Sequence, residues 1–153
     1  MALSTGQSAP DFELPADDGT VFRLSSRRGR RTLIVFYPGD DTSVCTAQLC
    51  EYRDGMEAFQ GLDTDVVGIS GDSLDSHKRF RAKYNLPFTL LSDTNLSVVE
   101  LYDCKALMGM KRGVYLVDEQ GIIRYRHVEA LSVFRRSRDE LIQAIQALGA
   151  QKA

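Results

Sequence analysis

The sequence predicts an α/β fold, because short β-rich runs alternate with helical patterns along the chain. Two of the runs, TLIVFY at residues 32–37 and DVVGIS at residues 65–70, are largely apolar. Runs of this kind are typical of central strands that are covered on both faces. We therefore expect these two strands in the middle of a sheet that is flanked by helices.

The segments around the central strands follow the same alternation. DFEL and VFRL flank the turn signal PADDGT and predict an N-terminal β-hairpin. Residues 42–59 have a helix-tolerant composition without proline, and residues 73–84 begin with polar capping residues and carry their charges on one side. We expect a helix in each of these two segments.

The second half of the chain predicts strands followed by a final helix. LPFTLLSD is a short strand, residues 95–102 are helical, and GVYLVDEQGIIRYRHV is a hairpin that turns at DEQG. Ser137 or Asp139 can cap the last helix. Its apolar residues recur at helical spacing, at Leu141, Ile142, Ile145 and Leu148. No repeat or linker interrupts the pattern, so we expect one domain over residues 1–153.

Composition excludes several classes of function. The chain has 153 residues and a net charge of −2, and it has no basic run that would indicate nucleic acid or a membrane surface as a partner. The N-terminus does not resemble an export signal, which predicts a cytoplasmic protein. In a reducing compartment, three cysteines do not form a disulfide scaffold, and thiols outside the core tend to be catalytic, sensing or metal-binding.

The stretch YPGDDTSVCTAQLC, residues 37–50, contains two of the three cysteines, five positions apart. Such a pair can be two packed thiols, half of a metal site, or a nucleophile with its partner. Cys45 follows a predicted strand and precedes a helical pattern, so we place it in the first turn of a helix. Free N–H groups and the positive end of the helix dipole favour a thiolate there.

A helix terminus alone does not supply the free energy that a reactive thiolate requires. Lowering the pKa of a thiol from roughly 8.5 to about 6 takes about 3.4 kcal/mol, whereas a helix terminus supplies at most about 2 kcal/mol. We therefore expect a cation near Cys45, and Arg112, before a predicted strand, is the candidate. Because a thiolate of lower pKa is also a weaker nucleophile, the substrate's oxygens need binding groups such as the Thr42 hydroxyl.

The histidines do not match a metal-site pattern. His77 and His127 lie too far from a matching cysteine pair to give zinc-site spacing, and we expect both at the surface. The sequence therefore predicts no metal centre.

At this point the residues match a known family. Pro38, Thr42 and Cys45 lie in PGDDTSVC, which resembles the proline-x-x-x-threonine-x-x-cysteine signature of peroxiredoxins, and Arg112 falls where that family carries an arginine. Over nearly its whole length, the sequence resembles the peroxiredoxin Q or bacterioferritin comigratory protein subfamily. It extends through GQSAPDFELPADDGT, FYPGDDTSVCTAQLCEYRD, VVGISGDSLDSHKRFRAKYNLPFTLLSD and VYLVDEQGIIRY.

The resemblance implies a thioredoxin-like fold, a central mixed sheet flanked by helices, and a thiol-dependent peroxidase that reduces hydrogen peroxide and organic hydroperoxides. By this resemblance Cys45 attacks the peroxide and becomes a sulfenic acid. Thr42 and Arg112 then position the peroxide and stabilise the transition state, and Pro38 shields the sulfenate. The resemblance further implies a monomer without haem or flavin.

Cys50 matches the resolving cysteine of the subfamily, which condenses with the sulfenic acid to an intramolecular disulfide that thioredoxin or a similar dithiol reduces. Five residues along an ideal helix separate two Cα atoms by roughly 8.6 Å, whereas a disulfide tolerates at most about 7 Å. If Cys45 and Cys50 lie on one helix, we expect residues 46–49 to unwind on oxidation.

The sequence leaves open the effects of three residues and the choice among alternative functions. Gln48 stands where the subfamily commonly has glutamate and Val44 where it commonly has glycine, which leaves the rate and the preferred peroxide undecided. Cys104 has no role by the resemblance, and we expect a buried core thiol. The alternatives are a 1-Cys-type peroxidase or peroxide sensor resolved by an external thiol, and a disulfide oxidoreductase, against which the missing CxxC argues.

Overall fold

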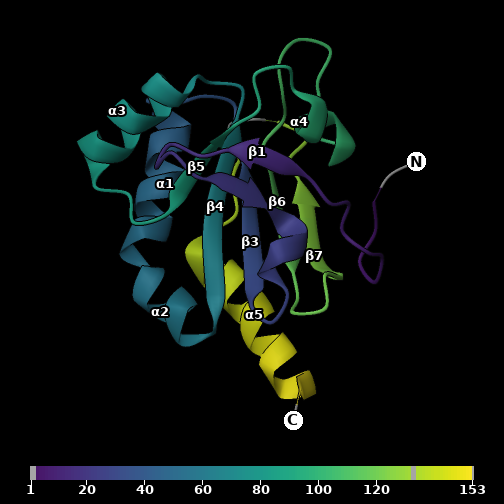
Figure 1. Ribbon diagram of the computed structural model, residues 1–153. Coiled ribbons are helices and arrows are strands. Elements are labelled where there is room, and N and C mark those ends of the chain that lie inside the picture. The colour runs from purple at the N-terminus through teal and green to yellow at the C-terminus, as the bar shows by residue number, and fades with distance from the viewer. Residues whose placement is uncertain (1–2, 132–133, 153) are drawn as a thin grey trace.

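The computed structural model describes residues 3–131 and 134–152, and its centre is a mixed five-stranded sheet (Figure 1). The strand order is β5-β4-β3-β6-β7, and β3 pairs in parallel with β4 and antiparallel with β6. The strands are β3 (Arg31–Phe36), β4 (Thr64–Ser70), β5 (Thr89–Ser92), β6 (Gly113–Val117) and β7 (Ile123–Val128). The prediction that the two apolar runs form neighbouring inner strands is confirmed.

The predicted N-terminal hairpin is also confirmed. Strands β1 (Glu13–Pro15) and β2 (Val21–Arg23) pair antiparallel and form a separate two-stranded sheet, followed by the short 3₁₀ helix η1 (Leu24–Arg27). Leu14 and Phe22 face each other in this pair and are both buried. In Figure 1 the hairpin lies in front of the five-stranded sheet, so it covers one of its faces.

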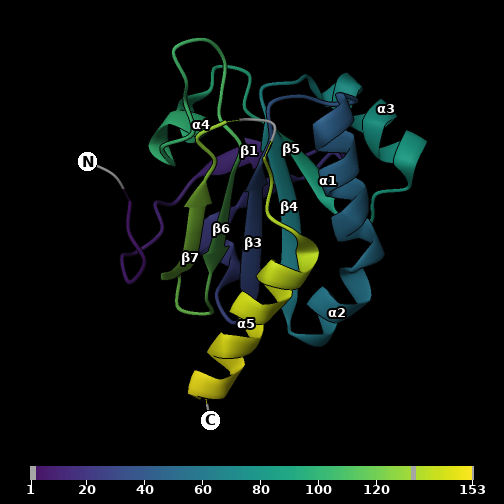
Figure 2. The ribbon, with the colours of Figure 1, turned by 180° about the vertical axis from the view of Figure 1, so that it is seen from behind.

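Five α-helices complete the described part of the chain, and Figure 2 shows α1 and α5 on the face opposite the hairpin. The side chain of Ser73 accepts a bond from the N–H of Ser76 and caps α3, and Ser137 accepts one from Glu140 at the start of α5. The helices are α1 (Ser43–Asp54), α2 (Met56–Gly61), α3 (Leu74–Tyr84), α4 (Ser97–Leu101) and α5 (Arg138–Lys152). Among the described residues, no helix is long and apolar enough to cross a bilayer.

One predicted element differs from the structure: residues 42–59 form two helices, and the break is at Gly55. The N–H of Gly55 bonds to the carbonyl of Tyr52, which ends α1. A Cβ atom at position 55 would lie 2.9 Å from Cδ of Arg138, at the start of α5. Glycine therefore lets α5 approach the end of α1 closely, a tertiary contact that helix propensity does not encode.

The sheet separates two hydrophobic cores. Alternate residues of β3 point to opposite faces, as a strand requires: Leu33 and Val35 pack with α1 and α5, whereas Ile34 and Phe36 pack with the hairpin and α4. The predicted apolar stripe of the last helix is confirmed, because Leu141 is fully buried in the first of these cores.

Candidate active site

Cys45 lies in the first turn of α1, as the sequence predicted. The chain leaves β3, passes through the loop of residues 37–42 and enters the helix with Thr42 at the N-cap position. Among the described residues, the Thr42 side chain makes no capping hydrogen bond, so it leaves the N–H groups of the first turn uncapped. The Cys45 side chain is 1% exposed, and these N–H groups supply partial positive charge around it.

Arg112 is the cation beside this thiol. Its side chain is 2% exposed, and its Nη1 lies 3.2 Å from Sγ of Cys45. The two residues meet because Gly113, the first residue of β6, pairs with Phe36, the last residue of β3. The guanidinium thus places a positive charge and an N–H donor directly against the sulfur atom.

Gln48 holds the arginine in place, a contact that the sequence analysis did not identify. The same Nη1 of Arg112 donates to Oε1 of Gln48 at 2.6 Å. Nε2 of Gln48 donates to the Tyr52 hydroxyl at 3.0 Å, and this hydroxyl donates to the carbonyl of Arg136 at 2.6 Å. The spacings i, i+3 and i+7 from Cys45 to Gln48 and Tyr52 are the signal that these side chains share one helix face.

The loop before Cys45 places the other predicted residues. Oγ1 of Thr42 donates to the carbonyl of Gly39 at 3.0 Å, so this hydroxyl has already used its hydrogen. Asp41, directly before Thr42, has a φ of 58°, in the left-handed region that non-glycine residues rarely adopt. Pro38 is exposed at the start of the loop, and its shielding of the sulfenate stays a prediction.

The prediction that His77 lies at the surface is wrong. Its side chain is 0% exposed, and its Nδ1 lies 2.8 Å from Oδ2 of Asp40 in the loop before Cys45. His127 is partly exposed and lies 3.2 Å from Glu129. His77 is buried because a carboxylate from another segment pairs with it. This pairing offsets the free-energy cost of burying a polar ring.

His77, Asp40 and Asp72 also bring three possible metal-ligand atoms within 4.8 Å of one another. Hydrogen bonds already engage them: Nδ1 of His77 faces Asp40, and Oδ2 of Asp72 accepts from the N–H of Asp40 and from Ser70. The absence of a metal cofactor therefore stays a prediction.

The other two cysteines differ from Cys45. All three are free thiols, and Cys50 lies on α1 with partial exposure. Cys104 is fully buried on the other side of the sheet, as predicted for a core thiol, and burial raises its pKa to about 12. The structure thus brings Cys45 and Arg112 into contact, places Thr42 and Cys50 on the same segment, and leaves Cys104 in the opposite core.

Comparisons with known proteins identify the family of the chain. Residues 5–126 match the AhpC/TSA family. Peroxiredoxin Bcp of Bacillus subtilis is 36% identical over 158 residues, which cover 97% of this chain and 96% of that protein. A putative peroxiredoxin bcp of Coxiella burnetii is 40% identical over 131 residues, 80% of this chain and 87% of that protein.

The fold is likewise shared with solved structures. The crystal structure of peroxidoxin BcpB from Mycobacterium tuberculosis superimposes with a TM-score of 0.87 at 27% identity and covers 95% of this chain and 98% of that one. This confirms the thioredoxin-like fold that the resemblance implied. The chain therefore belongs to the AhpC/TSA family of peroxiredoxins, within the peroxiredoxin Q and Bcp subfamily.

Proposed function

We propose that the chain is a thiol-dependent peroxidase in which Cys45 reduces hydrogen peroxide and organic hydroperoxides, and Cys50 resolves the product. The observation that carries the proposal is the 3.2 Å contact between the Arg112 guanidinium and Sγ of Cys45 in the first turn of α1. Two sources of positive charge thus act on one thiol, which favours the nucleophilic thiolate.

In the first step the Cys45 thiolate attacks the nearer oxygen of the peroxide. A sulfur–oxygen bond forms, the oxygen–oxygen bond breaks, and the sulfur loses two electrons to become a sulfenic acid. The departing oxygen takes a proton and leaves as water or an alcohol. The Arg112 guanidinium can bind the oxygens as negative charge moves from sulfur to the leaving group.

Thr42 has a defined part in this step. Its hydroxyl donates to the carbonyl of Gly39, so toward a substrate it can act only as an acceptor. It therefore accepts the hydrogen of the peroxide O–H group and orients the reacting oxygen toward Cys45. Gln48, which bonds to Arg112 at 2.6 Å, fixes the direction in which the guanidinium donates.

In the second step Cys50 attacks the sulfenic sulfur, the two cysteines form a disulfide, and the oxygen leaves as water. Both cysteines lie on α1, where a helix holds their Cα atoms farther apart than the about 7 Å that a disulfide tolerates. We infer that residues 46–49 unwind for this step.

The far end of α1 is anchored and limits the unwinding. Glu51 accepts bonds from the N–H of Arg138 at 2.6 Å and from the side chain of Arg135 at 2.9 Å. Tyr52 bonds to the carbonyl of Arg136 at 2.6 Å. These contacts tie the second half of the helix to the start of α5, so the turn that opens is the one between the cysteines.

Unwinding of this turn has a moderate cost. Exposing Leu49, which is 0% exposed, costs about 2 kcal/mol, and the two hydrogen bonds of Gln48 contribute about 1 kcal/mol each. Oγ1 of Thr46 is buried without a hydrogen-bond partner among the described residues, so regaining water offsets about 1 kcal/mol.

Peroxide-treated wild type and Cys50→Ser, analysed by disulfide mapping and by thioredoxin-coupled NADPH consumption, test the proposal. We expect a Cys45–Cys50 disulfide in the wild type and loss of turnover in the variant, which accumulates sulfenic acid. Full turnover of Cys50→Ser would mean that an external thiol resolves Cys45, as in a 1-Cys-type peroxidase or sensor. A wild type that consumes no peroxide would refute the proposed function itself.

A further inference from the structure

A buried to partly buried polar cluster joins α3 to the loop that leads into Cys45, and the peroxidase steps above use none of it. The cluster consists of Tyr37, Asp40, Asp72, Ser76 and His77. Figure 1 shows α3 beside α1, on the side of the sheet to which this loop leads.

The ring of His77 shows how many protons the cluster holds. Its Nε2 lies 3.0 Å from the carbonyl oxygen of Leu91, which can only accept, so Nε2 carries a hydrogen. Its Nδ1 lies 2.8 Å from Oδ2 of Asp40, and two acceptors cannot face each other at that distance. A second proton therefore lies between His77 and Asp40.

The surroundings of Asp40 indicate where this proton resides. The Tyr37 hydroxyl donates to Oδ1 at 2.6 Å, and Ser76 donates to Oδ2 at 2.8 Å. Burial first, and then the charge of Asp40, raises the pKa of Tyr37 well above its usual value, so its hydroxyl keeps its hydrogen. Tyr37 and Ser76 donate to this carboxyl whatever the position of the proton, and two such donors favour the carboxylate over the carboxylic acid. The proton is therefore assigned to the His77 side of the contact, which is then a buried ion pair.

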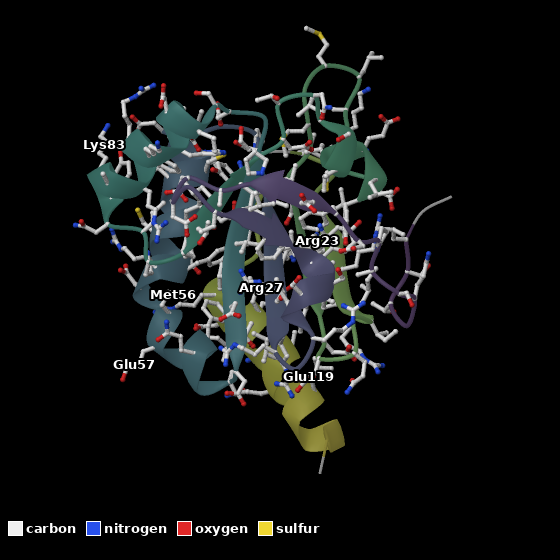
Figure 3. The ribbon with its side chains drawn as sticks, in the orientation of Figure 1. Arg23, Arg27, Met56, Glu57, Lys83 and Glu119 are labelled. Carbon is white, nitrogen blue, oxygen red and sulfur yellow. The ribbon has the colours of Figure 1, made fainter. Side chains whose placement is uncertain are left out.

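The same loop is fixed to its surroundings at two more points. The N–H of Asp40 donates to Oδ2 of Asp72 at 2.8 Å. The carboxylate of Asp41 receives Nζ of Lys83 at 2.8 Å and the Tyr84 hydroxyl at 3.0 Å. Figure 3 shows Lys83 on the outer side of α3, so Asp41 is held from the surface while Asp40 is held from within. These contacts keep Asp41 in its left-handed conformation, directly before Thr42.

We propose that His77 and Asp40 are positioning residues for the peroxidase reaction: their buried ion pair fixes the loop so that the Thr42 hydroxyl faces the reacting oxygen. The inference rests on the proposed function. The Cys45 thiol has its own support from Arg112 and the first turn of α1. The pair therefore governs how peroxide is oriented, and not how much thiolate is present.

Asp40→Asn tests this most sharply, because asparagine keeps the shape, removes the charge and donates to Nδ1 of a neutral His77. We would compare the second-order rate of Cys45 with hydrogen peroxide and its alkylation rate with iodoacetamide. The peroxide rate should fall about tenfold or more, since a displaced orienting group is costly, while alkylation changes by less than about twofold. Equal losses in both rates, or none in either, would overturn the proposal.

Asp75→Asn is the matched control, because it removes one carboxylate at an exposed position outside the cluster, on α3, the helix that carries His77. Both of its rates should equal those of the wild type. If Asp40→Asn does not fold, Ser76→Ala replaces it. This variant removes one donor to Asp40 and should lower the peroxide rate about two- to threefold with alkylation unchanged; an unchanged peroxide rate would overturn the proposal.

The ionisation of His77 is tested independently by nitrogen-15 NMR of its ring at neutral pH in the wild type. We expect both ring nitrogens to carry hydrogen, and one of them to lose it in Asp40→Asn. A neutral ring in the wild type would overturn the proposal. A wild type that does not react with peroxide would instead refute the proposed function, so the two failures are distinguishable.

Discussion

Cys45 and Cys104 are equally buried, but the groups that surround their sulfur atoms differ. Cys45 is 1% exposed in the first turn of α1, where Arg112 donates to its sulfur. Cys104 is 0% exposed just beyond the C-terminal end of α4, where its N–H bonds to the carbonyl of Val99. The first thiol faces N–H groups and a cation, whereas the second lies among apolar side chains.

The start of β6 separates these two environments. Arg112 precedes the strand and contacts Cys45, and the next residue, Gly113, packs against the other thiol: a Cβ atom on Gly113 would lie 2.7 Å from Sγ of Cys104. Desolvation raises the pKa of Cys104 to about 12, against an opposing effect from the charge of Arg126. Burial by itself makes a thiol inert, and the helix N-terminus and the guanidinium are what distinguish the surroundings of Cys45, the proposed nucleophile, from those of Cys104.

The largest expected effect is a difference in activity between two variants: replacing Cys45 should abolish peroxidase activity, whereas replacing Cys104 should preserve it. Cys45→Ser should abolish peroxide-dependent NADPH consumption coupled to thioredoxin, because it removes the proposed nucleophile. Cys104→Ala should keep the activity of the wild type within about twofold, although it leaves a small cavity that costs about 1–2 kcal/mol of stability. Peroxidase activity that depends on Cys104 would break the comparison.

The next largest effect concerns the cation. Arg112→Lys keeps a positive charge but loses the planar guanidinium, whose Nη1 donates to both Cys45 and Gln48. The second-order rate with hydrogen peroxide, measured by stopped flow, should fall about 100-fold, as when one donor to a developing charge is removed. A variant within about threefold of the wild type would show that charge alone suffices.

A smaller effect is expected from Gln48, which orients the guanidinium. Gln48→Leu removes the acceptor for Arg112 and should lower the peroxide rate about tenfold, the cost of one charge-assisted hydrogen bond. Gln48→Glu is the matched variant, because a carboxylate still accepts from Arg112, and its rate should stay within about threefold of the wild type. Equal rates for Gln48→Leu and wild type would show that Gln48 is not needed to orient the guanidinium.

A last effect concerns stability and not rate: a pH dependence that originates at Cys104 and is confined to alkaline pH. Its pKa of about 12 in the folded chain lies above the ordinary value of 9.0, so the folded state holds its proton more tightly. Stabilisation is then complete below pH 9 and is lost as the pH rises toward 12, by on the order of 4 kcal/mol. Urea unfolding should show the wild type losing more stability than Cys104→Ala over this range. Parallel curves would contradict it.

Local patterns were sufficient to predict the elements of the fold, because the apolar runs and capping residues that define them are contiguous in the sequence. The break at Gly55 was missed, although glycine is itself a poor helix former and here stands at the C-cap of α1. The place of Cys45 in a first turn was predictable from its position after a strand. Arg112 was predicted beside it for two other reasons: a helix terminus alone supplies too little free energy to stabilise a thiolate, and the related family carries an arginine at this position. Only the pairing of β3 with β6 explains their contact.

His77 shows the limit of such reasoning in physical terms. A histidine in a polar segment is exposed unless a partner satisfies its ring, and here the partners are Asp40 and the carbonyl of Leu91, both distant in sequence. Gln48 was noted only for a missing charge, although its spacing from Cys45 places both on one face of α1. Polar contacts across segments are set by topology, which a single sequence pattern does not contain.

The most direct test of the central claim is to map where sulfenic acid forms first. Cys50→Ser protein, in which the sulfenic acid persists, would be treated with an equimolar amount of hydrogen peroxide at neutral pH, labelled with a sulfenic acid-specific carbon nucleophile and analysed by peptide mass spectrometry. The account predicts label on Cys45 at least about tenfold in excess of Cys104. Comparable labelling of the two thiols would contradict it, because their burial is the same and only their surroundings differ.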